Sequence, residues 1–172
     1  MHEITIAEAL FLGLVQGFTE WLPISSSGHL VILQSLLGIA VPPEFDIVIM
    51  AGTIAALVLY FRSRILSLLM GLAAADRQAI RYLGFIILAG AATALIGFSV
   101  RPFFLGLFSQ PFVVSLLLIV TGIFLFIASR PRDQDKEITA TSALLAGIAQ
   151  GIAVAPGISR SGATIGLRCS WE

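Results

Sequence analysis

The feature that most constrains this chain is a polar run, Gln16–Leu30, inside one of its most apolar regions. The run reads QGFTEWLPISSSGHL and contains a glutamate, three serines and a histidine. A charge in hydrocarbon costs several kcal/mol unless it has a partner or a watery cavity. The position of Glu20 therefore requires a structural or functional reason.

The composition is that of an integral membrane protein. The chain is 58% hydrophobic and 12% charged, with a mean hydropathy of +0.99, whereas a soluble domain carries about 25% charged residues. The formal net charge is +0, which gives no argument for a nucleic-acid partner. Cys169 is the single cysteine, so the sequence contains neither an internal disulfide nor a Cys/His metal motif.

The first apolar segment, Ile4–Leu22, is interrupted by polar residues that share one helical face. Glu8, Gln16 and Glu20 are spaced by eight and four residues. On the neighbouring side, Gly13 and Gly17 would allow another helix to pack closely.

Pro23 ends this first helix, because the residue before a proline is biased away from helical angles. A second helix is expected to begin at Ser25–His29 and to run to Leu37, with Gly38 as its terminator. Neither half reaches the roughly 20 apolar residues of a membrane span. Two short helices that meet at a polar break indicate a re-entrant hairpin, lining a cavity or buried in protein.

Three clean transmembrane spans are expected after the hairpin, at Phe45–Phe61, Leu83–Val100 and Phe112–Ala128. Arg62–Tyr82 is interpreted as an interfacial loop around a short amphipathic stretch, and Ser129–Thr141 as the most hydrophilic loop. These two loops hold seven of the ten Lys and Arg residues, which places both in the cytoplasm. The connections Val41–Glu44 and Arg101–Pro111 would then lie outside.

The chain contains an internal repeat. Ala9–Ile32 aligns with Ala143–Gly166 without a gap, at an offset of 134 residues. The identical pairs are Ala9/Ala143, Leu10/Leu144, Gly13/Gly147, Gln16/Gln150, Gly17/Gly151, Ser25/Ser159, Ser27/Ser161 and Gly28/Gly162. A shared Gln-Gly followed nine residues later by Ser-x-Ser-Gly is not expected from two unrelated apolar helices.

Because three spans separate the two copies, the second hairpin enters from the opposite face. We therefore expect an all-α integral membrane protein with an inverted-topology repeat, whose two polar breaks meet near mid-membrane. The chain is interpreted as one membrane domain, residues 1–172, with repeat 1 at 4–128 and the start of repeat 2 at 141–172. Counterparts of the three spans are missing from the second copy, so we expect a truncated chain.

Together the two breaks bring a set of polar side chains into the membrane. They are Gln16, Glu20, Ser25, Ser26, Ser27, His29, Ser159, Arg160, Ser161 and Thr164. The guanidinium of Arg160 needs an anion, and its fork suits phosphate. Serines and backbone N–H groups at a helix start add a further anion site.

The remaining groups suit hydrolysis of a phosphate. Glu20 and His29 are candidates for acid–base work, with a serine hydroxyl as nucleophile. A carboxylate beside phosphates also suits Mg²⁺. Structural alternatives stay open: Ser25–Ser27 as an N-cap, Glu20 as the ion-pair partner of Arg160, and His29 as a core residue.

Two motifs resemble the undecaprenyl-diphosphate phosphatases of the bacitracin-resistance type. One is (E/Q)-x-x-x-E, here Gln16–Glu20, which runs into the segment Pro23–His29. The other is P-G-x-S-R-S-x-x-T, here Pro156–Thr164. Both motifs are complete, and with the hydropathy pattern the resemblance covers nearly the whole chain. Position 16 carries Gln rather than Glu, which leaves one carboxylate in the motif.

The resemblance implies a phosphatase in the plasma membrane that hydrolyses a C55 polyprenyl diphosphate to the monophosphate. This reaction recycles the lipid carrier of cell-wall synthesis and gives bacitracin resistance. The resemblance also implies a divalent cation, Mg²⁺ or alternatively Ca²⁺, and a site that faces the outside. Whether the chain forms a homo-oligomer stays open.

By match to the family motifs, each group acquires an expected role. Gln16 and Glu20 would serve the metal or the acid–base step. A serine of Ser25–Ser27, with His29, would be the nucleophile or its helper, and which serine attacks stays open. The diphosphate would be held by Arg160 together with Ser159, Ser161 and Thr164.

Two other classes of membrane protein share parts of this pattern. The membrane lipid phosphatases that carry S-R-x5-H are rejected, because Gly166 stands where that histidine is required and the only histidines are His2 and His29. A secondary transporter or lipid flippase with broken helices remains the alternative, as does an inactive fragment of the phosphatase. Phosphate release in detergent, where no gradient exists, discriminates the transporter from the enzyme.

Overall fold

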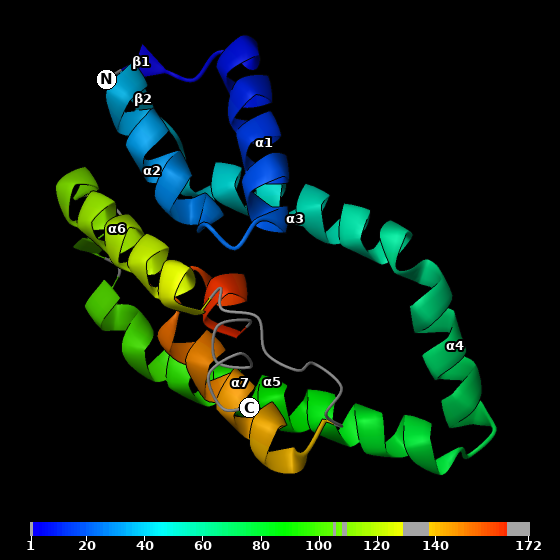
Figure 1. Cartoon of the computed structure of the whole chain (residues 1–172). Helices are drawn as coiled ribbons and strands as arrows, with labels where there is room; N and C mark the ends of the chain where they lie inside the picture. The colour runs from blue at the N-terminus through cyan, green and yellow to red at the C-terminus, as the bar shows by residue number, and fades with distance from the viewer. Residues whose placement is uncertain (1, 105, 108–109, 129–137, 165–172) are drawn as a thin grey trace.

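The computed structural model describes residues 2–104, 106–107, 110–128 and 138–164, and this part of the chain is almost entirely helical (Figure 1). The helices are α1 Ile6–Trp21, α2 Ser26–Leu37, α3 Pro43–Tyr60, α4 Arg62–Ala73, α5 Arg77–Phe104, α6 Pro111–Ala128 and α7 Ala140–Ile152. The predicted all-α class is confirmed.

The first helical hairpin has the predicted bounds. α1 ends at Leu22, which is extended (φ −94°, ψ 146°) as expected before Pro23. α2 ends at Gly38, whose left-handed backbone (φ +66°) turns its N–H back to the carbonyls of the last turn. The buried side chains of Leu12, Leu30 and Ile39 form a core between the two helices.

The end of this hairpin that lies away from the break is held together by contacts that the sequence pattern did not predict. β1, His2–Glu3, pairs in parallel with β2, Ile39–Ala40. Two-residue strands are too short to leave a periodic signal. Beside them, Thr5 and Glu8 form a capping box at the start of α1. The N–H and hydroxyl of Thr5, with His2, hold the pKa of the Glu8 carboxyl at about 2.

The membrane-spanning elements agree with the prediction only in part. In the described parts of the chain, two helices, α5 and α6, are long and apolar enough to cross a membrane, and α3 with α4 qualifies only as a pair bent by 67°. The span expected at Phe45–Phe61 is therefore not an isolated straight span. The span expected at Leu83–Val100 lies within α5, which extends beyond it at both ends.

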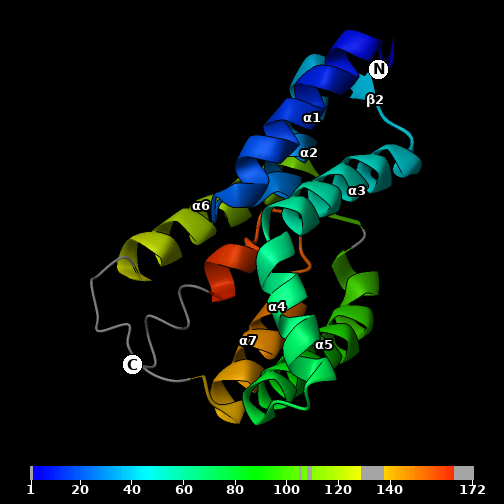
Figure 2. The ribbon, with the colours of Figure 1, turned by 90° about the vertical axis from the view of Figure 1, so that its right-hand side faces the viewer.

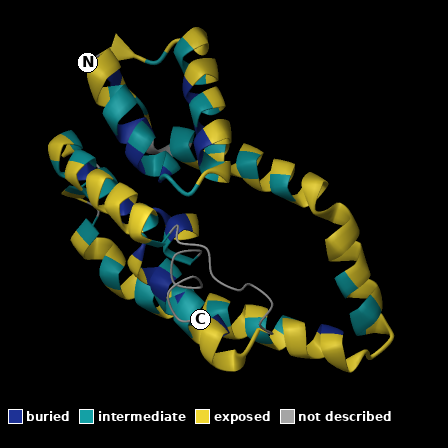
Figure 3. Cartoon of the chain, in the orientation of Figure 1, coloured by how far each residue is buried: buried dark blue, intermediate teal, exposed yellow. Residues whose placement is uncertain are grey.

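The interfacial loop predicted at Arg62–Tyr82 is wrong. These residues form all of α4, a turn that contains Ala75 (φ 53°), and the start of α5. The prediction treated four arginines as a mark of a loop, but arginine is a good helix former. α4 has no buried residue and is mostly exposed (Figure 3).

The closest helix packing joins α5 to α7, which lie side by side in both ribbon views (Figures 1 and 2). Gly147 and Gly151 of α7 make it possible. A Cβ on Gly147 would lie 2.4 Å from the carbonyl oxygen of Ala89, and one on Gly151 would lie 2.7 Å from Cβ of Ile96. The Thr93 hydroxyl lies 3.0 Å from the carbonyl oxygen of Gly147 and joins the two backbones.

Some predictions fall outside the described residues. They concern most of the basic loop, at residues 129–137, and the end of the chain, at residues 165–172, with Cys169. The single-domain interpretation and the assignment of loops to the two sides of the membrane stay predictions.

Candidate active site

The two helical breaks meet through reciprocal close contacts. A Cβ on Gly28 would lie 2.9 Å from Cα of Gly157, and one on Gly162 would lie 2.9 Å from the carbonyl oxygen of Pro23. At the repeat offset, Gly28 aligns with Gly162 and Pro23 aligns with Gly157. Gly28 therefore contacts the residue that aligns with Pro23, and Gly162, which aligns with Gly28, contacts Pro23 itself. Gly28, Gly157 and Gly162 are buried, and Pro23 is half-buried.

Ser25 joins the breaks rather than capping its own helix. It has a left-handed backbone (φ 64°), and its side chain makes no cap hydrogen bond to α2. Instead its Oγ accepts a hydrogen bond of 3.1 Å from the N–H of Gly157. The N-cap alternative is therefore wrong for the Ser25 side chain. A left-handed serine costs about 1 kcal/mol, which the contact between the breaks offsets.

The aligned residue of the second break, Ser159, does act as a local cap. Its Oγ accepts a hydrogen bond of 3.0 Å from the N–H of Gly162 and lies 3.2 Å from Oγ of Ser161. Ser159 is only 2% exposed. It therefore supports the turn that presents Arg160 rather than facing a ligand itself.

A hydrogen-bonded triad forms at the end of α1. Glu20 accepts a hydrogen bond of 3.0 Å from the side-chain amide of Gln16 and another from the hydroxyl of Ser26. Because Gln16 is only 2% exposed, its buried amide holds the carboxylate of Glu20 in one orientation. Among Ser25–Ser27, Ser26 is thus the one whose hydroxyl donates to a carboxylate. A hydroxyl that donates to a carboxylate is the arrangement of an activated nucleophile and its base.

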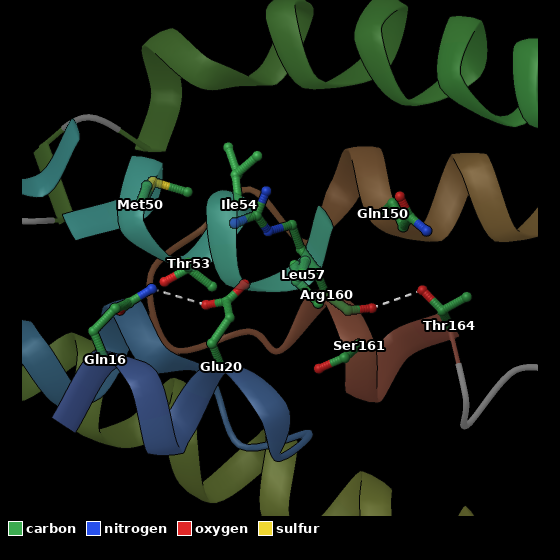
Figure 4. A pocket seen from close by; sticks show the side chains of 10 residues that line it. All are labelled: Gln16, Glu20, Met50, Thr53, Ile54, Leu57, Gln150, Arg160, Ser161 and Thr164. Atoms are coloured by element: carbon green, nitrogen blue, oxygen red, sulfur yellow. Dashed lines mark hydrogen bonds between the residues drawn. The ribbon is translucent and has the colours of Figure 1, made fainter. Parts of the chain in front are cut away.

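A pocket of about 340 Å³ lies between the hairpins and α3. Glu20 and Arg160 enter it from opposite hairpins (Figure 4). It is lined by Gln16, Glu20, Met50, Thr53, Ile54, Leu57, Gln150, Arg160, Ser161 and Thr164. Of the predicted phosphate-holding groups, the pocket thus contains Arg160, Ser161 and Thr164.

The guanidinium of Arg160 forms no ion pair with any residue in the described parts of the chain. Arg160 is exposed toward the pocket, and Thr164 donates a hydrogen bond of 2.7 Å to its carbonyl oxygen. The structural alternative of a Glu20–Arg160 ion pair is therefore wrong. An exposed, unpaired guanidinium beside hydroxyl groups is suited to bind an anion.

His29 lies at the break but does not line this pocket. Its Nδ1 lies 2.8 Å from the carbonyl oxygen of Ser25, so Nδ1 carries a proton and donates. The side chains of Ser25, Ser26, Ser27 and Ser159 are also off the pocket lining. Ser26 is connected to the pocket through its hydrogen bond to Glu20, and Oγ of Ser27 lies 3.5 Å from that of Ser25. The structure therefore brings together only part of the predicted catalytic set.

Several lining residues were not among the predicted site residues. Gln150 aligns with Gln16 in the repeat, and that alignment was a usable signal. α3 contributes Thr53, Ile54 and Leu57, which form an apolar wall with one hydroxyl. α3 is apolar on all sides, so its sequence does not show which face borders the site.

A divalent cation would have few protein ligands here. Among the described residues, no group of three or more His, Cys, Asp or Glu side chains could hold a metal. Among the residues that the structure describes, Glu20 is the only carboxylate that lines the pocket. Mg²⁺ commonly binds one or two carboxylates plus substrate phosphates and waters. The donor set therefore fits a cation that is shared with a bound phosphate.

These features define an α-helical protein with helices apolar enough to cross a membrane and a pocket beside two helix breaks. The sequence model of the family described as bacitracin resistance protein BacA matches residues 9–169. The chain belongs to this family.

Curated relatives support the same assignment. The chain is 42% identical to the undecaprenyl-diphosphatase of Syntrophotalea carbinolica, with 95% of this chain and 65% of the relative covered. It is 40% identical to that of Carboxydothermus hydrogenoformans, with 95% and 64% covered. It is 39% identical to that of Halothermothrix orenii, with 93% and 62% covered. The chain thus spans slightly less than two thirds of the length of these relatives.

Proposed function

We propose that this chain carries the catalytic half of a membrane phosphatase that converts undecaprenyl diphosphate to its monophosphate. The observation that carries the proposal is the hydrogen bond from Ser26 to Glu20, because Glu20 lines the same pocket as the guanidinium of Arg160, which forms no ion pair with a described residue. The names of the relatives supply the substrate.

In the proposed reaction, Arg160 binds the terminal phosphate, with Ser161 and Thr164 as further donors. The hydroxyl oxygen of Ser26 attacks phosphorus while Glu20 accepts the hydroxyl proton. The O–P bond to Ser26 forms and the bridging P–O bond breaks, which releases the lipid monophosphate. Glu20 gives the hydroxyl proton to the departing lipid monophosphate and is ionised again. Water then attacks the phosphoserine while Glu20 accepts a water proton; the O–P bond to Ser26 breaks, Ser26 takes up that proton, and phosphate leaves.

Gln16 and Glu20 are the residues that would hold a divalent cation, Mg²⁺ or alternatively Ca²⁺. Such a cation would neutralise charge on the diphosphate. Gln16 keeps the carboxylate of Glu20 oriented by its hydrogen bond. His29, which donates to the Ser25 carbonyl, positions the backbone of the serine segment.

We also propose that the two hairpins are re-entrant halves of an inverted-topology repeat in the plasma membrane. The reciprocal contacts of Gly28 with Gly157 and of Gly162 with Pro23 support this relation. The breaks would meet near mid-membrane with the pocket open to the outside, where a lipid diphosphate is presented.

The test is phosphate release from undecaprenyl diphosphate in detergent, with Mg²⁺ and with chelator. The preparations are this chain and the chain extended to the full length of its relatives. Metal-dependent release by the extended chain is expected. No release by either preparation, with substrate movement in sealed vesicles instead, would favour a transporter and contradict the proposal.

A further inference from the structure

One face of α1 carries a shallow apolar groove that no described residue fills. It is lined by Gly13, Leu14, Gly17, Phe18, Trp21 and Leu22. A Cβ on Gly13 or on Gly17 would meet nothing within 4 Å in the described parts of the chain. The side chains at its edges are exposed, among them Phe18 at 73% and Leu14 at 62%. The close helix packing that the sequence predicts at these glycines is therefore not made by a described residue.

The aligned face of α7 shows what such a groove accepts. Gly147 and Gly151 align with Gly13 and Gly17, and both are buried against α5. α5 meets them with a face of small residues and one hydroxyl, in which Ala89 approaches Gly147, and Thr93 and Ile96 approach Gly151. Small residues at such positions let two helix backbones approach closely.

We propose that the groove on α1 is the docking site of an apolar membrane helix with the same kind of face as α5. The occupant is the second-repeat counterpart of α5, which at an offset of 134 residues lies beyond residue 172. The inference rests on the inverted repeat proposed above. The relatives have length to supply such a helix, because this chain covers only 65% of the first and 64% of the second.

The α5–α7 contact also predicts the polar detail of the docking. Thr93 of α5 reaches the carbonyl oxygen of Gly147 at 3.0 Å. The occupant is therefore expected to carry a hydroxyl residue at the position aligned with Thr93, in reach of the carbonyl oxygen of Gly13. A second copy of this chain is a poorer fit, because its own α5 already presents this face to its own α7.

The experiment measures association rather than catalysis. This chain, with Cys169→Ser, is co-expressed with the portion of the Syntrophotalea carbinolica relative that it does not match, and a tag on the chain is used for purification in detergent. We expect the two pieces to co-purify. Gly13→Leu and Gly17→Leu are each expected to reduce co-purification at least tenfold, because leucine fills the groove.

Matched controls are Gly84→Leu and Gly122→Leu, two other exposed helical glycines whose Cβ would meet nothing within 4 Å. These variants should co-purify like the unchanged chain. A cysteine at Gly17 should also form a disulfide with a cysteine at the partner position aligned with Thr93, and a cysteine at Gly122 should not.

Equal co-purification by the Gly13 and Gly17 variants would overturn the proposal, as would a homodimer of the chain that Gly17→Leu disrupts. Intact association without any phosphate release would count against the proposed function and leave the docking site standing.

Discussion

The two helix breaks share the residues that form their mutual contact but differ in the side chains proposed for the reaction. Their shared residues make the frame: Ser25 and Ser159 organise the turns, while Gly28 and Gly162 let the breaks approach. The residues proposed for the reaction stand at positions where the two breaks differ. Ser26 aligns with Arg160, and Glu20 aligns with Val154. In the proposed reaction, one break supplies the nucleophile and the base, and the other supplies the anion-binding charge.

This comparison indicates how two breaks of similar sequence can form one asymmetric site. They share the residues of their mutual contact and differ at the aligned pairs Glu20/Val154 and Ser26/Arg160. Gln16 illustrates the difference, because it donates to Glu20, whereas its counterpart Gln150 has Val154 at the corresponding place. Substitutions at frame positions should therefore affect stability, and substitutions at divergent positions should affect turnover.

The largest effect is expected for Glu20→Gln in the chain extended to the length of its relatives. Loss of the base should lower phosphate release about a thousandfold with little change in thermal unfolding. Gln16→Ala, which removes only the supporting amide, should cost about tenfold. If Glu20→Gln released phosphate within threefold of the unchanged enzyme, Glu20 would be a frame residue rather than the base.

Arg160→Ala should lower phosphate release about a hundredfold, since the charge that stabilises the phosphate is lost. Arg160 is exposed and pairs with no described carboxylate, so its replacement should leave unfolding unchanged. Arg160→Lys should recover part of the rate, because lysine keeps the charge without the bidentate fork. Kinetics with undecaprenyl diphosphate measure this, and an unchanged KM and kcat in Arg160→Ala would remove its assigned role.

Gly28→Ala and Gly162→Ala test whether the two helix breaks depend equally on their mutual contact. In both, the new Cβ would lie 2.9 Å from backbone of the opposite break. Each variant should lose about 2 kcal/mol of stability through overpacking, by similar amounts. Gly122→Ala, which has open space, is the control. Thermal unfolding in detergent would contradict the symmetry if only one of the two variants were destabilised.

The smallest effect is expected at the start of α1. Thr5 and His2 lower the pKa of Glu8 from its ordinary value of 4.5 to about 2. The Glu8 carboxylate therefore stabilises the native state fully above pH 4.5. That contribution is lost as the pH falls toward 2. The protection of amide hydrogens in the first turn of α1, relative to the intrinsic exchange rate at each pH, should fall over this window. Thr5→Ala should remove the pH dependence, and its persistence would exclude the capping box as the cause.

The sequence predicted the parts of the site that depend on local signals. Pro23 and Gly38 marked the helix ends, and the four-residue spacing of Gln16 and Glu20 placed them on one face. The repeat alignment predicted that Arg160 and Glu20 would meet, and both line one pocket.

The rest depends on tertiary structure. The left-handed backbone of Ser25 turns its hydroxyl toward Gly157, which no propensity of serine indicates. His29 is oriented by the same turn and therefore lies off the pocket lining. The arginines of α4 and α5 misled the prediction of a loop, because charge alone does not decide whether a segment is helical.

The most direct test of the central claim is phosphate release by Ser26→Ala beside Ser27→Ala, both in the chain extended to the length of its relatives. The two serines are neighbours in the same turn, but only Ser26 donates to Glu20. We predict that Ser26→Ala loses phosphate release by a thousandfold or more, roughly the scale of losing a catalytic nucleophile. Ser27→Ala should keep most of the activity. Near-normal turnover in Ser26→Ala would contradict the account.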